Sequence, residues 1–221
     1  MTKNAKLSII FAGTAVLIVA VLLIATGGDD TTTTTTETVS SGADAEVMRD
    51  NTHILGPEGA SGVELVEFLD FECESCLALF PIMERLREEY AGEVTFGMRY
   101  FPIESHANAQ IAAQAVEAAS KQGALEEMYI KMYETQPEWG EQQESKRDLF
   151  IGFAEELGLD RKQFIADLDA QSTIDRIAYD QKEGLALGVQ GTPTLYLNGE
   201  PMEPGPYEQM KAEIDAALEG Q

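Results

Sequence analysis

The run of residues 64–71 (ELVEFLDF) constrains the fold of this 221-residue chain most strongly. It is nearly continuously apolar and rich in β-forming side chains, as expected of a strand that is buried on both faces. Residues 74–90 follow at once with apolar side chains at helical spacing, and Gly92 ends that pattern. A buried strand that leads directly into a helix predicts an α/β fold.

The rest of the globular part predicts the order strand, strand, helix, strand, a block of helices, then strand, strand and a last helix. The Asn198-Gly199 pair predicts a hairpin between the last two strands. The other predicted strands are 53–55, 94–101, 194–197 and 200–202, and the other predicted helices are 107–122, 125–133, 145–157, 161–168, 172–187 and 207–218. We interpret the helical stripe Met128, Tyr129, Met132 and Tyr133 as core, and we place Trp139 in a loop without a functional role.

Residues 7–26 form an uncharged apolar run that predicts a transmembrane signal-anchor. At about 1.5 Å per residue the run spans about 30 Å, the thickness of a bilayer core. Lys3 and Lys6 precede it, so residues 1–6 are predicted to be a cytoplasmic tail of a single-pass cell-membrane protein whose other residues are extracytoplasmic. A cleaved signal peptide is the alternative, although its apolar region is usually only about 7–15 residues long. Both interpretations export the domain.

Residues 27–50 are rich in Thr, Ser, Gly and acidic residues, and they include six consecutive threonines. This composition buries too little apolar surface to order itself, so we predict a flexible linker. The globular domain is then predicted to occupy residues 51–221, with a helical insertion at approximately 105–188.

The charge balance excludes one class of partner. The chain has 39 acidic and 15 basic residues, a formal net charge of −24. A surface this negative repels phosphate backbones, so no nucleic-acid partner is predicted. The chain also has only two cysteines, so its fold depends on a hydrophobic core rather than on a disulfide framework.

Those two cysteines form the motif Cys73-Glu74-Ser75-Cys76 at the predicted strand-to-helix junction. The unpaired N–H groups and the dipole of a helix N-terminus stabilise a thiolate, so Cys73 is predicted to be the nucleophile. Cys76 lies one turn further on and is predicted to be the resolving thiol. Half of a zinc site is an alternative, but only His53 and His106 could complete its ligands, so we predict no metal. A structural disulfide is a second alternative, although so short a loop contributes little stability.

The run VEFLDFECESC, from Val66 to Cys76, resembles the active-site region of the DsbA-like branch of thioredoxin-fold disulfide oxidoreductases. Pro81 matches the proline that commonly kinks the active-site helix of this superfamily, and residues 189–195 (VQGTPTL) resemble its cis-proline loop. The helical block between the second and third core strands resembles the insertion of that branch. The resemblance therefore implies a thioredoxin-like fold with a helical insertion over residues 51–221.

The resemblance also implies roles for three residues outside the motif. Thr192 and Pro193 are expected to form a cis peptide whose exposed backbone pairs with an extended substrate. Glu67 has apolar neighbours and lies six residues before Cys73, where the superfamily keeps a buried acid. Burial is expected to raise its pKa and to suit it to relay a proton for Cys76.

The dipeptide between the cysteines departs from the family pattern, and the resemblance assigns no role to His106. The strongly oxidising members of the branch have Pro-His between the cysteines, whereas Glu74 and Ser75 supply no cation here, although Ser75 can donate a hydrogen bond to sulfur. We therefore predict a pKa of Cys73 that is less depressed, and a disulfide that is less oxidising, than in Pro-His members. His106, at the start of a helix, is interpreted as a surface or capping residue rather than as one that faces the active site.

The predicted function is a membrane-tethered, extracytoplasmic enzyme that forms or exchanges disulfides in exported proteins. Its partners would be the thiols of unfolded exported proteins, a membrane or thiol redox partner that resets the active site, and the membrane itself through the N-terminal helix. No cofactor is predicted beyond the redox-active disulfide between Cys73 and Cys76. A reductase or isomerase, including one that serves cytochrome maturation, and a non-catalytic redox-sensing module remain alternatives.

Overall fold

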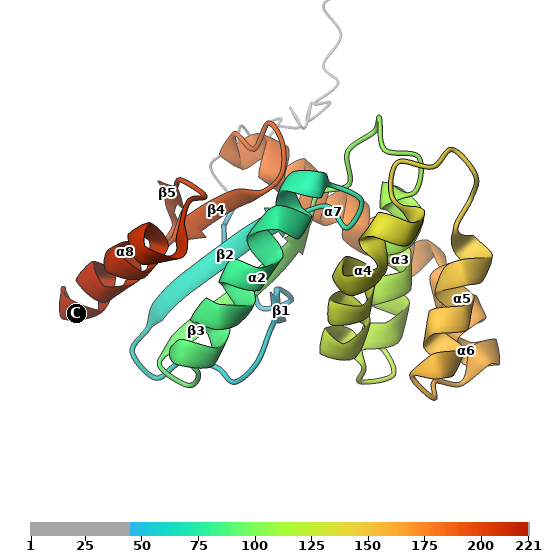
Figure 1. Ribbon diagram of the computed structural model, residues 1–221, viewed down its shortest axis with the longest axis horizontal. Helices are drawn as coiled ribbons and strands as arrows, with labels where there is room; N and C mark the ends of the chain where they lie inside the picture. Colours follow the sequence, from blue (N-terminus) through green and yellow to red (C-terminus); the bar gives the residue numbers. More distant parts are fainter. Residues whose placement is uncertain (1–44, 221) are drawn as a thin grey trace, which may run out of the picture. The chain divides into compact units, whose positions relative to one another are not determined.

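The computed structural model describes residues 45–220, whose regular elements are a five-stranded sheet and seven helices (Figure 1). The predicted transmembrane segment 7–26 and most of the predicted linker lie outside these residues, and residues 45–50 contain no helix or strand. Within the described part, no helix is both long enough and apolar enough to cross a membrane.

The sheet has the order β1-β3-β2-β4-β5. Strands β2 and β3 are parallel, and the other three neighbouring pairs are antiparallel. Their bounds are His53–Ile54 (β1), Val63–Leu69 (β2), Val94–Tyr100 (β3), Thr194–Leu197 (β4) and Glu200–Met202 (β5). The apolar run of β2 therefore occupies the centre of the sheet, where Glu67 lies opposite Met98 on one side and Leu195 on the other.

Helices cover both faces of the sheet. On one face α2 (Glu74–Glu89) and α8 (Tyr207–Glu219) pack on alternate residues of the strands, such as Leu65 and Phe96. On the other face the end of α7 (Gln171–Leu187) meets the side chains of Phe68 and Phe101. At that contact Gly184 is needed, because a Cβ there would approach a ring carbon of Phe101 to 2.8 Å.

The helical insertion joins β3 to β4. It consists of α3 (Ala109–Ser120), α4 (Leu125–Trp139), α5 (Arg147–Glu156), α6 (Arg161–Leu168) and α7. The small side chains of the alanine-rich α3 allow its neighbours to approach closely, and the helix is buried along most of its length. Figure 1 shows α3 to α6 beside the sheet, next to the end of α2 that carries the cysteines. The predicted order of elements is confirmed, with bounds that differ by a few residues.

Trp139 corrects one prediction. It is the last residue of α4 rather than part of a loop, and its fully buried ring packs edge-on against Phe150 at 4.9 Å between centroids. Pro137 and Gly140 suggested a break before it, but Pro137 lies in the last turn of the helix, where burial of the indole outweighs the poor helix propensity of proline. The stripe of Met128, Tyr129, Met132 and Tyr133 is buried core, as predicted.

A buried charge cluster ties α7 to the sheet. The guanidinium of Arg99 on β3 is fully buried and donates to Asp180 at 2.5 Å and to Glu183 at 2.6 Å, both on α7. The same guanidinium donates to the carbonyl oxygens of Glu46 and Val47 at 3.2 Å. The segment that enters the domain, strand β3 and the last insertion helix are therefore joined through one side chain.

Candidate active site

Both cysteines lie at the N-terminus of α2, at the predicted junction between strand and helix. Cys73 is the N-cap residue, with an extended backbone, and its N–H donates to the carbonyl oxygen of Asp70 at 3.1 Å. Cys76 lies within the first turn. Both are free thiols, with 8% of Cys73 and 1% of Cys76 exposed to solvent. An incoming sulfur therefore reaches Cys73 more readily than Cys76.

The surroundings of Cys73 favour its thiolate. The hydrogen bond from the Cys76 thiol is the largest effect and lowers the pKa of Cys73, against the opposing effect of burial. The side chain of Thr192 and the backbone N–H groups of Cys76 and Ser75 lower it further, so that the pKa falls from 9.0 to about 5. Ser75 thus contributes its backbone N–H, whereas the sequence suggested its hydroxyl.

The surroundings of Cys76 favour its protonated thiol. Burial raises its pKa well above 9.0, and the hydrogen bond to Cys73 and the negative charges of Glu67 and Cys73 raise it further. At neutral pH the pair therefore consists of one thiolate that can attack or leave, and one protonated thiol that is shielded from solvent.

The loop between α7 and β4 brings Thr192 and Pro193 next to Cys73, 119 residues away in the chain. The Thr192–Pro193 peptide is cis, as expected. The Cys73 thiol donates to the carbonyl oxygen of Thr192 at 3.3 Å. The Thr192 hydroxyl is buried and has no hydrogen-bond partner within standard distance among the described residues, which leaves it available to a Cys73 thiolate.

Glu67 lies on β2 with only 4% of its surface exposed. Burial raises its pKa from 4.5 to about 8, and the negative charges of Cys73 and Glu84 add to the effect. The side chain is therefore placed where the sequence predicted a buried acid, and its pKa suits proton transfer near neutral pH.

Three polar side chains that the sequence did not single out shape the loop before Cys73. The Asp70 carboxylate accepts hydrogen bonds from the N–H groups of Glu72 and Ile103 at 2.8 and 3.0 Å. Gln136 of α4 donates to the carbonyl oxygens of Phe71 and Cys73 at 2.7 and 3.1 Å. Glu72 accepts from the N–H groups of Asn108 and Glu141. The insertion therefore supplies much of the support of the active-site loop.

His106 belongs to this group and corrects a second prediction. Its Nδ1 is hydrogen-bonded to Asp70 at 2.7 Å, and about a third of its side chain is exposed, so it is not simply a surface or capping residue. The sheet explains this contact, because β2 and β3 are parallel and their carboxyl ends meet at one edge. Asp70 directly follows β2, and His106 lies in the turn that follows β3.

Beneath the motif, Phe71 packs on the rings of Tyr129 and Tyr133 of α4, with Phe80 of α2 against the same two tyrosines. Pro81 lies within α2, at the position that the resemblance assigned to it.

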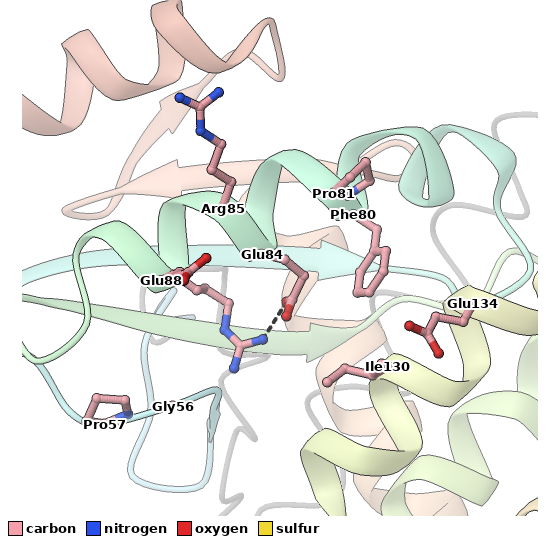
Figure 2. Close-up of a pocket in the computed structure, with 10 residues that line it drawn as sticks. Gly56, Pro57, Phe80, Pro81, Glu84, Arg85, Glu88, Ile130 and Glu134 are labelled. Carbon is pink, nitrogen blue, oxygen red and sulfur yellow. Dashed lines mark hydrogen bonds and ion pairs between the residues drawn. The ribbon is translucent and has the colours of Figure 1, made fainter.

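A surface cavity of about 710 Å³ opens between α2 and α4 beside these rings. Figure 2 shows Phe80 and Glu84 projecting from α2 toward Ile130 and Glu134 on the opposite wall. Neither cysteine lines this cavity, but the Glu84 carboxylate connects it electrostatically to Glu67.

Comparison with known proteins decides the family. A family model described as Thioredoxin matches residues 49–216. The probable disulfide bond formation protein D of Bacillus cereus is 31% identical over 175 residues, which cover 74% of this chain and 77% of that protein. The chain belongs to the DsbA-like branch of the thioredoxin superfamily.

This DsbA-like chain also matches part of a much longer protein. The Na(+)/H(+) antiporter NhaA of Herminiimonas arsenicoxydans is 34% identical over 174 residues, covering 76% of this chain but only 26% of the antiporter. The chain thus spans about a quarter of the length of such relatives.

Solved structures show the same DsbA-like fold. A thioredoxin-like oxidoreductase from Silicibacter pomeroyi has 25% identity and a TM-score of 0.67, with 80% of this chain and 98% of that chain covered. Oxidised BdbD from Bacillus subtilis has 22% identity and a TM-score of 0.70, with 79% and 97% covered.

Within the DsbA-like branch, the Glu74-Ser75 dipeptide sets this chain apart from Pro-His members. Both residues are exposed, and the pKa of Cys73 is about 5. That value lies between those of about 3.5 for DsbA itself and about 7 for thioredoxin. That the thiolate is less stabilised than in Pro-His members stays a prediction.

Proposed function

We propose that this chain is a thiol–disulfide oxidoreductase that forms or exchanges disulfides in exported proteins, with Cys73 as the nucleophile and Cys76 as the resolving thiol. The observation that carries the proposal is the contrast between the two thiols. The pKa of Cys73 is lowered to about 5, whereas that of the more deeply buried Cys76 is raised well above 9.0. A pair of inert or purely structural cysteines has no need of this difference.

In the oxidising direction the cycle begins with a disulfide between Cys73 and Cys76. A substrate thiolate attacks the Cys73 sulfur, the bond to Cys76 breaks, and Cys76 leaves as a thiolate that takes up a proton. A second substrate thiolate then attacks the substrate sulfur of the mixed disulfide and releases Cys73 as a thiolate. The substrate gains a disulfide, and two electrons remain on the reduced cysteine pair.

Three groups assist these steps. The low pKa of Cys73 makes it a good leaving group in the second attack. Protonated Glu67, with a pKa of about 8, can supply the proton that Cys76 needs. The Thr192 backbone beside Cys73 is positioned to pair with an extended substrate segment.

The pKa of Cys73 favours the oxidising direction, because a stabilised thiolate stabilises the reduced enzyme. The Bacillus cereus relative, a probable disulfide bond formation protein, supports the same direction. We expect a reduction potential between about −120 mV, as in DsbA, and about −270 mV, as in thioredoxin. A potential at or below the thioredoxin value would favour the reductase alternative.

The proposal includes a membrane-tethered, extracytoplasmic location. It is supported by the uncharged run 7–26 with Lys3 and Lys6 before it. A domain outside the cytoplasm meets exported proteins while their thiols are still accessible. Each turnover in the oxidising direction leaves the enzyme reduced, so a redox partner must take up two electrons from Cys73 and Cys76.

Trapping tests the proposal. A Cys76→Ala variant lacks the resolving thiol, so it should accumulate mixed disulfides between Cys73 and exported proteins in cells, visible as adducts on non-reducing gels. The Cys73→Ala variant is the matched control and should form none. If Cys76→Ala collects no adducts while wild-type Cys73 and Cys76 still change redox state, the chain is a redox sensor rather than an exchange enzyme.

A further inference from the structure

Asp70 connects His106 to the active-site cysteine. Its carboxylate is fully buried and hydrogen-bonded to His106 Nδ1 at 2.7 Å, while its carbonyl oxygen accepts the Cys73 N–H at 3.1 Å. One residue therefore holds the imidazole with its side chain and the nucleophile with its backbone. The remaining bonds of the carboxylate, to the N–H groups of Glu72 and Ile103, fix it in place.

This arrangement poses an electrostatic problem for Cys73. A buried carboxylate in the same loop disfavours a second negative charge on a nearby sulfur. The dipeptide between the cysteines adds to the problem, because Glu74 is acidic and neither residue is a cation. A positive charge from elsewhere in the fold would therefore stabilise the Cys73 thiolate beyond what the hydrogen bonds to its sulfur supply.

His106 is the candidate source of that charge, because the groups that face it are acidic or neutral. They are Asp70, Glu72 and Cys73 from the active-site loop, Glu104 from the same turn, Gln110 from α3 and Gln181 from α7. Glu104, Gln110 and Gln181 line with His106 a surface cavity of about 440 Å³. Among the described residues that line this cavity, only the imidazole can carry a positive charge.

We propose that His106, held in place by Asp70, is a positioning residue that supplies beside Cys73 the positive charge that the Glu74-Ser75 dipeptide lacks. The inference rests on the proposed exchange chemistry at Cys73. It places in the turn after β3 a cation that offsets the buried charge of Asp70 and stabilises the thiolate.

The titration of His106 supports this role. Burial lowers its pKa, but the hydrogen bond to Asp70 and the negative charges of Asp70, Cys73 and Glu72 outweigh burial and raise the pKa above 6.5. Coupling between two sites is reciprocal, so the imidazolium lowers the pKa of Cys73 as the thiolate raises that of His106. Both charges coexist from about pH 5, the pKa of Cys73, up to the raised pKa of His106.

Two substitutions separate charge from hydrogen bonding. His106→Gln keeps a donor for Asp70 but removes the charge, and His106→Lys keeps a charge. His53→Gln is the matched control, because His53 pairs with Glu117 at 2.6 Å and is the only other histidine of the chain. The full chain of each variant is titrated by the ultraviolet absorbance of the thiolate, and its reduction potential is measured in glutathione buffers with alkylation of the free thiols.

We expect His106→Gln to raise the pKa of Cys73 by roughly 0.5–1 unit, less than the roughly 1–3 units that a directly contacting opposite charge gives, because Asp70 stands between the two groups. A full unit is a tenfold change in the equilibrium constant, which lowers the potential by about 30 mV. The difference from wild type should vanish above the raised pKa of His106, where the wild-type imidazole is neutral. His106→Lys should keep the low pKa of Cys73, and its positive charge should stabilise the thiolate up to a higher pH than the imidazolium does. His53→Gln should match wild type.

Different results overturn different claims. If wild-type Cys73 has an ordinary thiol pKa and exchanges no disulfide, the proposed function itself fails. If wild-type Cys73 titrates near 5 but His106→Gln leaves the pKa and the potential unchanged, only the role of His106 is wrong. That role is also wrong if Gln and Lys at this position shift Cys73 equally, because the hydrogen-bond geometry rather than the charge would then matter.

Discussion

Two cysteines three residues apart acquire opposite protonation preferences from their immediate surroundings. Cys73 occupies the N-cap, where backbone N–H groups and Cys76 donate to its sulfur. Cys76 is enclosed by apolar side chains and faces the charge of Glu67. At the residue scale the chemistry therefore depends on position within one helical turn, because the two side chains are identical.

Glu67→Gln tests the buried acid through stability. Its pKa is about 8 in the folded state against 4.5 unfolded, so the contribution of Glu67 to stability falls as pH rises between these values and is constant above them. The variant lacks this loss, so at about pH 9 its free energy of unfolding should exceed that of wild type by roughly 3–5 kcal/mol. Denaturant unfolding at several pH values measures the gap, which should close below about pH 4.5.

Glu64→Gln, a partly exposed carboxylate on the same strand, is the matched control for this experiment. Glu67→Gln should also slow the release of mixed disulfides if Glu67 relays the proton of Cys76. An unchanged pH profile of stability would show that Glu67 is not buried as described.

Thr192→Val tests the hydroxyl beside Cys73. The substitution keeps the shape of the side chain but removes a donor to the thiolate, so the pKa of Cys73 should rise above about 5 and alkylation of Cys73 near neutral pH should slow. Thr194→Val is the control, because the Thr194 hydroxyl donates to the Gly191 carbonyl at 2.8 Å within the same loop. Equal effects of the two substitutions would attribute the change to loop geometry.

The sequence predicted the residues of the site whose signals are local. Cys73 and Cys76 are recognised by their spacing and by a strand-to-helix junction, and Glu67 by a carboxylate within an apolar run. His106, Asp70 and Gln136 have no such local signal, because each also has a partner at least 33 residues away in the chain that the sequence does not reveal. Only knowledge of the parallel pairing of β2 and β3, and of the packing of α4, brings them to the cysteines.

At the element scale, α2 and α4 depend on one another at the active site. Gln136 projects from α4 and satisfies two buried carbonyl groups at the start of α2, those of Phe71 and Cys73. The aromatic contacts of Phe80 with Tyr129 and Tyr133 add apolar contact between the same two helices. The insertion helix is therefore part of the active-site framework.

Gln136→Leu should destabilise the chain by about 1–3 kcal/mol, because it keeps the volume of the side chain but removes the amide donor of the Phe71 carbonyl, whereas the Cys73 carbonyl keeps the N–H of Leu77. Gln142→Leu is the control, since the exposed Gln142 amide bonds to the Glu138 carbonyl and to the Lys146 ammonium, and its loss should change stability by less than about 0.5 kcal/mol. Denaturant unfolding of both variants provides the comparison. Equal stabilities would mean that water replaces the Gln136 amide without cost.

The order of elements was predictable because apolar periodicity is strong in both β2 and the helices of the insertion. The end of α4 was not, since Pro137 and Gly140 argue for a break and only the burial of Trp139 against Phe150 continues the helix. At the end of α4, the burial of Trp139 thus outweighed the low helix propensity of Pro137 and Gly140.

At the scale of the whole molecule, a buried cation joins elements that the chain separates widely. Arg99 links β3 to α7, 81 residues further on, and to the segment at residues 46 and 47. Its partners Asp180 and Glu183 are buried, so the cluster is satisfied only when all these elements are in place. The folding of the sheet and of the insertion should therefore be cooperative.

Arg99→Met should cost about 3 kcal/mol of stability, the lower end of the range for breaking a buried ion pair, because Asp180 and Glu183 lose their fully buried cation but keep ion pairs with Arg176 and Arg49. The surface pair of Arg161 and Glu155 is the control, and Arg161→Met should cost less than about 1 kcal/mol. Thermal unfolding followed by two spectroscopic probes measures both variants. A single shared transition supports one cooperative unit, whereas separate transitions of sheet and insertion would contradict it.

The contacts of Gln136, Asn108 and Glu141 with the loop before Cys73 have a consequence for protein engineering. We expect the redox properties of this chain to depend on more than the tetrapeptide Cys-Glu-Ser-Cys, because the tetrapeptide is supported by the insertion and by the Thr192 loop. Grafting these four residues onto a minimal thioredoxin scaffold would transfer the sequence motif but not the reduction potential of this chain. The smallest portable unit is the motif together with α3, α4, the turn that bears His106 and the Thr192–Pro193 loop.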